Sequence, residues 1–358
     1  MCIRDSPDDD HVDPDERRRV ELVAHGPHGD LCAPFTRRHD KHFVWSPDGG
    51  AVVGYRTIFG VSVSGPGPVG ASESVPAALE AWLELCADRG WRPMMIGADD
   101  TVRALAERHP ITGRRRMRGL HFGDEVVVHT PSFQLDTPAM RNVRQAVQRS
   151  RNAGVTVTVR REGEIAVALR AELLDVVGEW ENGRGTYGYS MTMDHLLDGT
   201  YGDAVLVIAE WGGRVVGFQR WFGARGGTGL TLDVMPRRRQ CPNGVNERLI
   251  IEACDWSRQR NITDLSLNFA AFRQVFDADR TVARAVQYRI VHLLDRFIDV
   301  ESLYRFNAKF HPTWKSRHVL FESVFDLPLV IAAAVRLEFG RRPEHAITAT
   351  YEVGTRRV

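Results

Sequence analysis

Residues 214–236, RVVGFQRWFGARGGTGLTLDVMP, together with residues 244–261, GVNERLIIEACDWSRQRN, decide the expected fold. The first stretch predicts a hairpin of two strands, because β-branched and aromatic residues flank a glycine-rich turn. The second stretch predicts an amphipathic helix, because its apolar residues recur at the 3.6-residue period, at Val245, Leu249, Ala253 and Trp256. Residues 262–269, ITDLSLNF, then predict a closing strand.

The same order of elements occurs earlier in the chain. Residues 51–70, AVVGYRTIFGVSVSGPGPVG, predict a hairpin that also begins Val-Val-Gly-aromatic, residues 74–90 predict a helix, and residues 91–98 a strand. We interpret this as an internal duplication. A strand-strand-helix-strand unit is the centre of the acyl-CoA N-acyltransferase (GNAT) fold, so the expected class is α/β (α+β), with two tandem GNAT-like domains that each have a mixed sheet flanked by helices.

The expected boundary lies near residue 165. It gives an N-terminal domain over residues 35–165 and a C-terminal, catalytic domain over residues 166–340. Residues 1–34 lack periodicity and are expected to be a disordered leader, and residues 341–358 a tail. Helices are also expected over about 138–152, 281–309 and 327–339.

The composition is that of a soluble globular protein, with 358 residues, 43% hydrophobic, 26% charged and a net charge of +1. No apolar run reaches the roughly 18 residues of a membrane-spanning helix, and no signal peptide is evident. The five cysteines form no C-x-x-C pair, which argues against a zinc site or a disulfide framework. A cytoplasmic protein is therefore expected.

The loop before the second helix is unusually basic. Arg237, Arg238 and Arg239 precede Asn243 and Gly244, which stand where the helix begins. The N-terminus of a helix favours an anion, so the loop predicts phosphate binding; a solvated loop with Asn243 as a simple cap is the alternative. The stretch QCPNGVN lacks the second glycine of an acetyl-CoA pyrophosphate motif, so coenzyme A is not expected and no cofactor is proposed.

Basic residues also cluster elsewhere in a chain of nearly zero net charge. One group lies on the predicted helix 138–152, and another near the C-terminus contains Arg305, Lys309, Lys315 and Arg317, with the aromatic Trp314 between them. Such segregated charge predicts a phosphate-backbone ligand, although each group alone is more typical of a solvated face. Only three of the 47 basic side chains are lysines (Lys41, Lys309 and Lys315), which favours a specific use for each.

Several separated motifs carry a family resemblance. Residues 230–247 (LTLDVMPRRRQCPNGVNE), 265–276 (LSLNFAAFRQVF) and 301–321 (ESLYRFNAKFHPTWKSRHVLF), with 43–56 and 121–128, resemble the catalytic domain of the aminoacyl-phosphatidylglycerol synthases, in particular the actinobacterial phosphatidylglycerol lysyltransferase type. The resemblance implies two tandem acyltransferase-type folds. It also implies transfer of lysine or alanine from aminoacyl-tRNA to a hydroxyl of phosphatidylglycerol.

The resemblance carries over residue by residue. Asp233 matches the first position of the family's Asp-Leu-Met-Arg pattern, but Pro236 stands where the arginine is expected and Arg237 follows one residue late. The Asn-Gly pair matches as Asn243 and Gly244. The family's aromatic-Ser pair matches at Ser190. The closing pattern Lys-Phe-x-Pro-x-Trp-x-x-Arg matches at Lys309, Phe310, Pro312, Trp314 and Arg317. The acidic residue expected at Thr186 is absent, which leaves the amino acid open.

Three residues are the candidates for catalysis. Asp233 is expected to act as general base or to hold the substrate's α-amino group, with a loop cap as the alternative. Lys309 is expected to neutralise the oxyanion or a 3′-terminal phosphate, with a simple surface lysine as the alternative. Ser190 is a weaker candidate for a hydroxyl relay. Asp233 and Lys309 are expected to share one cleft, and no Ser-His-Asp set or metal-ligand set emerges.

The expected partners are aminoacyl-tRNA and the anionic lipid phosphatidylglycerol, and DNA is not expected. Basic patches, with helix 327–339, could place the protein peripherally at the inner face of the membrane, although packing of that helix on its own domain is the commoner outcome. Three other functions stay open: a GNAT-fold acyltransferase, an aminoacyl-tRNA-dependent transferase with a soluble acceptor, and an inactive tRNA- or lipid-binding module.

Overall fold

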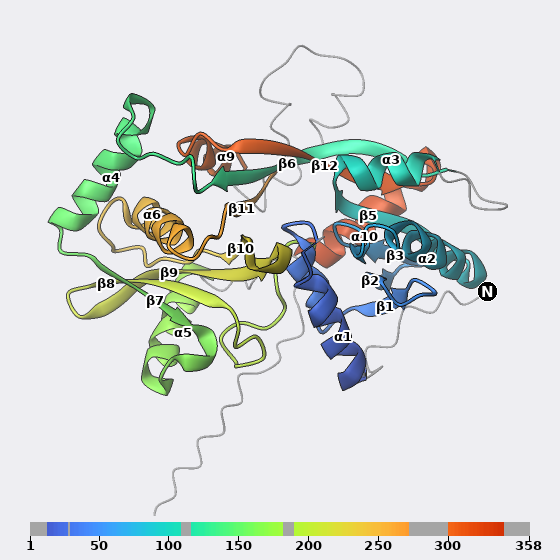
Figure 1. Cartoon of the computed structure of the whole chain (residues 1–358), viewed down its shortest axis with the longest axis horizontal. Helices are drawn as coiled ribbons and strands as arrows, with labels where there is room; N and C mark the ends of the chain where they lie inside the picture. Colours follow the sequence, from blue (N-terminus) through green and yellow to red (C-terminus); the bar gives the residue numbers. More distant parts are fainter. Residues whose placement is uncertain (1–12, 28, 109–115, 182–189, 272–299, 340–358) are drawn as a thin grey trace, which may run out of the picture.

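A computed structural model describes residues 13–27, 29–108, 116–181, 190–271 and 300–339. Within this part of the chain, twelve strands form one continuous mixed sheet with helices on both faces (Figure 1). The strand order is β1-β2-β3-β5-β12-β6-β11-β10-β9-β8-β7, and β4 pairs with β2. The expectation of a mixed α/β fold is confirmed, but the expectation of a separate sheet in each domain is wrong.

The half drawn mainly in blue in Figure 1 holds the first repeat and the strand that follows it. Its strands are β1 (His42–Trp45), β2 (Ala51–Ile58), β3 (Val61–Ser64), β4 (Val69–Gly70), β5 (Arg92–Ala98) and β6 (Arg118–His129). Its helices are α2 (Val75–Arg89) and α3 (Asp100–Arg108), preceded by α1 (Pro14–Ala24) and the 3₁₀ turn η1 (Ala33–Arg37).

The other half holds the second repeat. Its strands are β7 (Thr156–Arg161), β8 (Val205–Trp211), β9 (Arg214–Ala224), β10 (Gly229–Val234) and β11 (Asp264–Ala271). Its helices are α4 (Arg141–Asn152), α5 (Val167–Glu181) and α6 (Val245–Arg258). The chain then forms α9 (Val300–Ala308), β12 (Thr313–Phe321) and α10 (Leu327–Phe339). Short 3₁₀ turns lie at Pro138–Met140, Glu162–Glu164, Arg225–Gly227 and Val324–Asp326.

The two repeats have the same strand pairing. In the first, β2 is antiparallel to β3 and β3 is parallel to β5, while in the second β9 is antiparallel to β10 and β10 is parallel to β11. Strands β12 and β6 lie between the repeats, and β12 pairs with both β5 and β6. A strand from near residue 320 therefore completes the sheet beside the first repeat, and a boundary at residue 165 does not divide the sheet.

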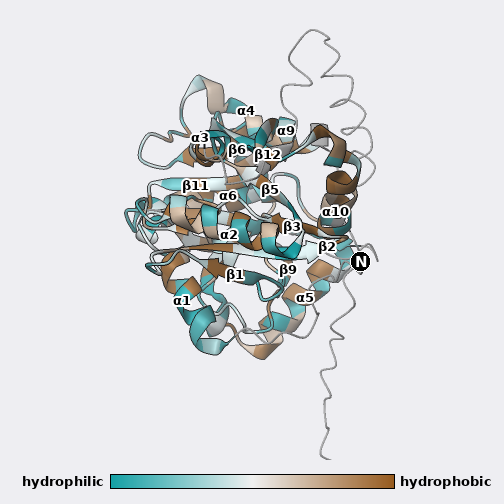
Figure 2. Cartoon of the chain, turned by 90° about the vertical axis from the view of Figure 1, so that its right-hand side faces the viewer, coloured by the Kyte–Doolittle hydropathy of each residue, from teal (hydrophilic) through white to brown (hydrophobic). Residues whose placement is uncertain are grey.

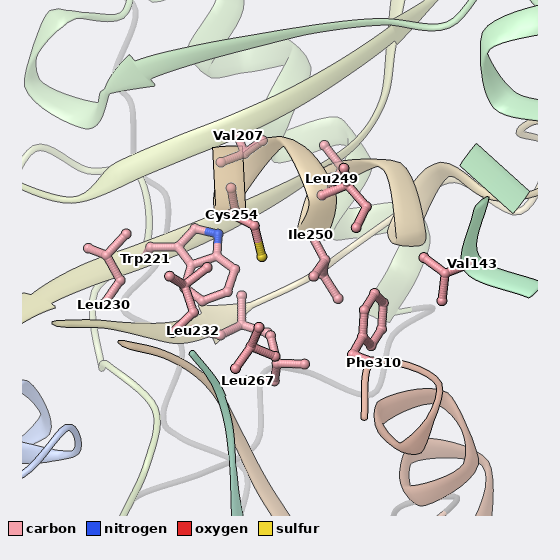
Figure 3. Packing of buried hydrophobic residues seen from close by; sticks show 14 of the residues in the cluster. Val143, Val207, Trp221, Leu230, Leu232, Leu249, Ile250, Cys254, Leu267 and Phe310 are labelled. Carbon is pink, nitrogen blue, oxygen red and sulfur yellow. The ribbon is translucent and has the colours of Figure 1, made fainter. Parts of the chain in front are cut away.

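The main core lies between the sheet and α6. Leu249, Ile250 and Cys254 of α6 pack against Trp221 and Leu232 of the sheet (Figure 3). Helix α5 covers the opposite face, where its Leu173 and Val176 contact Phe218. This arrangement follows from the alternation of side chains along a strand, which sends successive residues to opposite faces.

Part of the expected disordered leader is folded. Helix α1 begins with Pro14 after Asp13, whose side chain accepts a hydrogen bond from the backbone of Asp15. It is held by the ion pair of Glu21 with Arg37 and by the hydrogen bond from the Trp45 indole to Glu16. The prediction of disorder is thus wrong for the described leader residues, because their partners lie far away in the sequence.

Helix α10 packs on β3 through Val330 and Ala333, while Val324 and Phe325 just before it are exposed. Figure 2 shows hydrophobic stretches along α10 at one edge of the molecule. Within the described residues, no helix combines the length and the apolar character needed to cross a bilayer. The part of the expected helix 281–309 that precedes residue 300, the tail 341–358 and Thr186 lie outside the described residues.

Candidate active site

The parallel strands β10 and β11 diverge next to Asp233. They pair at Gly229 with Asp264, at Leu230 with Leu265 and at Thr231 with Ser266, and the described register ends there although both strands continue. Backbone groups beyond this point need other partners, because buried amide and carbonyl groups are nearly always hydrogen-bonded. The divergence therefore creates a place where a further segment, or a substrate, can bind.

Residues 190–195 lie at this divergence. The Asn268 side-chain amide donates to the carbonyl oxygens of Met191 (2.7 Å) and Leu232 (2.9 Å). The backbone N–H of Met193 donates to Oδ1 of Asp233 at 2.8 Å. Asn268 has a φ of +70°, in the left-handed region that asparagine tolerates better than most residues. Asp233 and Asn268 together hold the segment in place.

Asp233 also forms an ion pair inside the protein. Its Oδ2 lies 3.1 Å from Nη1 of Arg220 on β9, and Nε of Arg220 lies 2.7 Å from Oε2 of Glu162. Nη1 of Arg220 also donates to the carbonyl of His195 at 2.6 Å. Burial raises the pKa of Asp233, and the neighbouring Arg220 opposes that shift. A carboxylate with these partners is suited to positioning residues 190–195.

A second charged group lies beside Ser190. Lys41 is buried, and its Nζ donates to the carbonyl of Phe35 at 3.0 Å. Burial, followed by the nearby Arg38, lowers the pKa of Lys41 to about 7. A Cβ atom on Gly65 would lie 3.1 Å from this Nζ and 3.7 Å from the Ser190 carbonyl oxygen, so Gly65 leaves room between them.

Ser190 and its neighbours are tied to both halves of the molecule. The Ser190 N–H donates to Oε1 of Glu338 on α10 at 2.9 Å. Arg38 donates to the carbonyl of Thr192 and forms a two-pronged pair with Asp40 at 2.8 and 2.7 Å. The segment that carries Ser190 is thus held by α10, by β10 and by the residues that precede β1.

Lys309 lies on the other side of the sheet. Leu230 and Leu232 point into the core beneath α6. Asp233 instead pairs with Arg220, which lies on the same face of β9 as Phe218 in the core beneath α5, so it faces away from α6. Lys309 forms an ion pair with Glu247 in the first turn of α6 (2.9 Å), and its side chain is 40% exposed. The prediction that Asp233 and Lys309 share one cleft is therefore wrong.

The N-terminus of α6 is covered by another helix. Gly244 has a φ of +89°, and a Cβ atom on it would lie 2.1 Å from the carbonyl oxygen of Ala146 in α4. Asn243 is exposed, and no side chain caps the helix. Gly244 is thus required for the packing of α4 on α6, and the expected phosphate cradle at this glycine is occupied by protein backbone.

The three consecutive arginines do not act as one group. The segment returns along β9, where Arg238 N–H donates to Val216 O and Pro236 O accepts from Phe218. The Arg238 guanidinium contacts the Val215 carbonyl and Glu179 of α5, at 2.8 and 3.0 Å. Arg237 and Arg239 are exposed, so only these two side chains of the three project toward solvent.

Arg317 is a buried structural residue. Its side chain is 1% exposed and contacts both carboxylate oxygens of Asp30, the carboxylate of Glu125 and the Gly97 carbonyl. With both terminal nitrogens engaged by these groups, Arg317 has no surface for a phosphate, which corrects that expectation. Arg305 is exposed on α9, and Trp314 lies against Tyr304 with ring centroids 5.3 Å apart and the ring planes tilted by 36°.

Most residues around Asp233 carry no signal in the sequence. Arg220 and Glu162 stand in none of the family motifs, Asn268 stands in the motif of residues 265–276 without a role attached to it, and Lys41 stands out only because lysine is rare in the chain. Two cavities, of about 570 and 220 Å³, are lined by residues around Arg116 and around His311, and neither lining contains Asp233 or Ser190. The candidate site is thus a polar cluster at the strand divergence.

Comparisons with known proteins give this cluster a context. Residues 20–321 match the family model described as phosphatidylglycerol lysyltransferase, C-terminal. The chain is 36% identical over 350 residues to the lysylphosphatidylglycerol biosynthesis bifunctional protein LysX of Gordonia bronchialis, which covers 92% of this chain and 30% of that protein. It is 34% identical to the MprF-like domain protein Rv1619 of Mycobacterium tuberculosis, over 94% of this chain and 69% of that protein.

Solved structures share the fold. L-PGS from Bacillus licheniformis superposes with a TM-score of 0.77 at 21% identity, covering 93% of this chain and 98% of that one. A C-terminal domain assigned to a lysylphosphatidylglycerol synthetase of Agrobacterium fabrum gives a TM-score of 0.77 at 20% identity, covering 92% and 98%. The chain spans less than a third of the length of the LysX protein it matches. On this evidence, the chain belongs to the phosphatidylglycerol lysyltransferase C-terminal domain family.

Proposed function

We propose that this chain is an aminoacyltransferase that moves an amino acid, lysine in the first place, from aminoacyl-tRNA to a hydroxyl group of phosphatidylglycerol. The observation that carries the proposal is the family match over residues 20–321, which includes Lys41, Ser190, Asp233 and Asn268. We place the reaction where β10 and β11 diverge, because Ser190 lies in the segment at that point and the other three residues surround it.

The chemistry requires little beyond positioning. The ester of an aminoacyl-tRNA is already activated, so a lipid hydroxyl oxygen attacks its carbonyl carbon and gives up its proton. The bond from that carbon to the ribose oxygen of the tRNA then breaks, and the ribose oxygen takes up a proton. Holding two substrates in the correct geometry can supply effective molarities of roughly 10⁵ M or more. Asp233 and Asn268 would act as positioning residues for residues 190–195. Lys41 and Ser190 would line the substrate, and Lys41, whose pKa is lowered to about 7, would be able to give up or take up a proton there.

A basic edge of the molecule supports tRNA as the donor. Between residues 138 and 161 the chain has six arginines and no acidic residue. Helix α4 buries Val143, Ala146 and Val147 and exposes most of its arginines, and β7 continues the basic strip along the sheet edge. Neutralising phosphates with arginine is the main source of affinity for a nucleic acid backbone.

The strip also leads to the candidate site. Glu162 directly follows β7 and contacts Arg220, the partner of Asp233. A tRNA acceptor stem bound along α4 and β7 could therefore extend its 3′ end toward Asp233. We propose that Arg237, Arg239, Arg305 and Lys309, which are exposed, contribute further phosphate contacts on the same nucleic acid.

A lipid acceptor is supported by the position of α10. The exposed Val324 and Phe325 precede this helix, and its Glu338 holds the N–H of Ser190. Phe325 and Glu338 lie at opposite ends of α10, about 20 Å apart at 1.5 Å per residue, so a bilayer that contacts the helix along its length would place the lipid hydroxyl close to the candidate site. We therefore propose a peripheral position at the inner face of the cell membrane for this part of the protein.

Transfer of labelled lysine tests the proposal. Purified protein, tRNA charged with lysine, alanine or arginine, and phosphatidylglycerol vesicles should give a chloroform-extractable labelled product, most abundant with lysine. Lys41→Met and Asn268→Ala should lower the yield at least tenfold, whereas Lys315→Met serves as the matched lysine control. Labelling only of a water-soluble acceptor would favour a different acceptor, and tRNA binding without any transfer would favour an inactive module.

A separate experiment tests the alternative of a GNAT-fold acyltransferase that uses coenzyme A. Acetyl-coenzyme A should neither raise the unfolding temperature nor acetylate an added amine, because the N-terminus of α6 is covered by Ala146. If coenzyme A clearly raised the unfolding temperature and tRNA had no effect on it, acyl-coenzyme A would be favoured as the donor in place of aminoacyl-tRNA.

A further inference from the structure

The closing family motif around Phe310 lines a cavity away from the candidate site. The cavity has a volume of about 220 Å³ and lies where the end of β6, the loop 132–137, the 3₁₀ turn Pro138–Met140 and residues 310–313 meet. Val128, Met140 and Phe310 form its apolar part and are at most 5% exposed. Among the described residues that line it, none is acidic. The lining therefore suits an uncharged ring and does not suit a cation.

The size of the cavity limits the occupant to one ring system. Pockets that enclose a whole small-molecule ligand usually have roughly 300–1,000 Å³, so this one is too small for a complete nucleotide or cofactor. The partly buried Phe133 contributes an aromatic ring to the wall. Unpaired bases of RNA stack on aromatic side chains and form hydrogen bonds along their edges. One base is thus an occupant of suitable size and chemistry.

Polar side chains on the wall match the edge of such a base. Nδ1 of His129 lies 3.1 Å from the Asp264 carboxylate, and Nε2 of His311 lies 3.3 Å from the Ala139 carbonyl. Both oxygens accept, so each neutral ring can accept a hydrogen bond at its other nitrogen. The exposed Gln134 amide can donate and accept. His311 also has a φ of +46°, a strained conformation of the kind that gathers at functional sites.

Two arginines hold the loop that forms one wall. Nη1 of Arg144 donates to the carbonyls of Leu135 and Thr137, at 2.7 and 3.1 Å. Nη2 of Arg258 donates to the Phe133 carbonyl at 2.9 Å. Both guanidinium groups thus place positive charge beside the cavity, where the phosphates of a bound nucleotide would need it. Helix α4, which carries part of the basic strip, begins where the lining 3₁₀ turn ends.

We propose that this cavity takes one unpaired base of the RNA donor, in the first place a base with an exocyclic amino group. The base would stack on Phe133 and face Gln134, and its neighbouring phosphates would contact Arg144 and Arg258. The inference rests on the proposed tRNA donor. It adds a contact that a stem along α4 and β7 does not provide, because the bases of a duplex are already paired and stacked.

Filter binding of uncharged tRNA to the full chain at several salt concentrations tests the proposal. Phe133→Leu keeps an apolar side chain but removes the aromatic ring, so it should weaken binding about 5- to 150-fold. Gln134→Ala should weaken it about 2- to 10-fold. Neither side chain neutralises a phosphate, so both variants should keep the slope of log Kd against log salt concentration.

Two control variants separate this contact from others. Arg149→Met removes an exposed arginine of α4 and should change that slope by roughly 1. Phe59→Leu is the matched aromatic control, because Phe59 is 45% exposed in the turn between β2 and β3, and it should bind tRNA like the wild type. Circular dichroism should show that each variant is folded, and the exposed position of Gln134 makes Gln134→Ala the variant least sensitive to folding.

Chemical probing of the tRNA locates the contact. Dimethyl sulfate methylates the Watson–Crick edge of unpaired adenine and cytosine, and the wild type should protect at least one such base that Phe133→Leu leaves reactive. Salt-sensitive tRNA binding that is equally strong in the wild type and in both cavity variants would overturn the base site and leave the proposed donor in place. A wild type that binds no tRNA would overturn both.

Discussion

Arg220 and Asp233 lie on adjacent strands of the sheet and form a fully buried ion pair, with Nη1 3.1 Å from Oδ2. The pair is part of a larger set, since Arg220 also contacts Glu162 and the His195 carbonyl. It connects the strand that carries Asp233 to the segment that carries Ser190. The contribution of this ion pair to the free energy of unfolding can be measured separately from any role of Asp233 in substrate binding.

Replacing Asp233 with asparagine should destabilise the protein. The side-chain carbonyl of the new amide could still accept from the Met193 N–H, but Arg220 would lose one of its two carboxylates, and breaking a buried pair costs about 3–5 kcal/mol. Urea unfolding should show a loss of this order. Asp255→Asn is the control, because its pair with Arg258 is exposed and worth about 1 kcal/mol or less. Equal losses in both variants would contradict the structural role of Asp233.

Gly244→Ala tests the packing of α4 on α6. The added Cβ would lie 2.1 Å from the Ala146 carbonyl oxygen, in addition to the strain of a φ of +89°. Gly154→Ala is a close control, because Gly154 has a φ of +84° and its added Cβ would meet nothing within 4 Å. The control should lose about 1–2 kcal/mol, and Gly244→Ala about 1–3 kcal/mol more. Both free energies come from urea unfolding, and similar losses would mean that α4 does not contact Gly244.

Arg317→Met should act on stability and not selectively on tRNA binding. The substitution leaves the buried carboxylates of Asp30 and Glu125 without their cation, at a cost of about 3–5 kcal/mol. Arg237→Met, on an exposed side chain, should change stability by about 0.5 kcal/mol or less and weaken tRNA binding at low salt. Filter binding at several salt concentrations measures the second effect. A stable Arg317→Met protein with weakened tRNA binding would restore Arg317 as a phosphate contact.

The turn at Asp48 should contribute to acid sensitivity. The Ser46 and Ser74 hydroxyls and the Gly50 N–H donate to this carboxylate, and these hydrogen bonds lower its pKa to about 2. A folded-state pKa below the unfolded value of about 3.9 means that the stabilisation is complete above about pH 4. It is lost as the pH falls through the folded-state pKa.

Asp48→Asn should therefore flatten this part of the stability curve. Urea midpoints measured between about pH 2 and pH 6 should fall less steeply for the variant than for the wild type. Asp88→Asn, on an exposed carboxylate near the end of α2, provides the comparison. Parallel curves for Asp48→Asn and the wild type would rule out this contribution.

Local patterns predict the elements of this fold well. The sequence reveals the hairpins, the closing strands and helices 75–89 and 245–258, because strands and helices each have a characteristic pattern of hydrophobic residues. The matching order of these elements reveals the repeat. The union of both repeats in one sheet is not predictable in this way. It depends on β12 pairing with β5, a contact between segments more than 200 residues apart that leaves no local signature.

The candidate site is less predictable than the fold. Family motifs contain Asp233, Ser190 and Asn268, but the set that Asp233 forms with Arg220 and Glu162 depends on which face of each strand is inward at one level of the sheet. Gly244 suggests a phosphate site because glycine allows any close approach, and the sequence does not say whether a ligand or protein backbone approaches it. The basic motif around Arg317 likewise suggests a phosphate contact. The sequence does not show that this side chain is paired with Asp30, which lies 287 residues earlier.

The central position of β12 has a consequence for folding of the protein during its synthesis on the ribosome. Strands β5 and β6 emerge early, yet each has β12 as a neighbour, and β12 is translated about 190 residues after β6 ends. At roughly 5–20 residues per second, that delay is about 10–40 s. During this interval the nascent first half exposes two unpaired strand edges, and such edges are prone to pair with other chains.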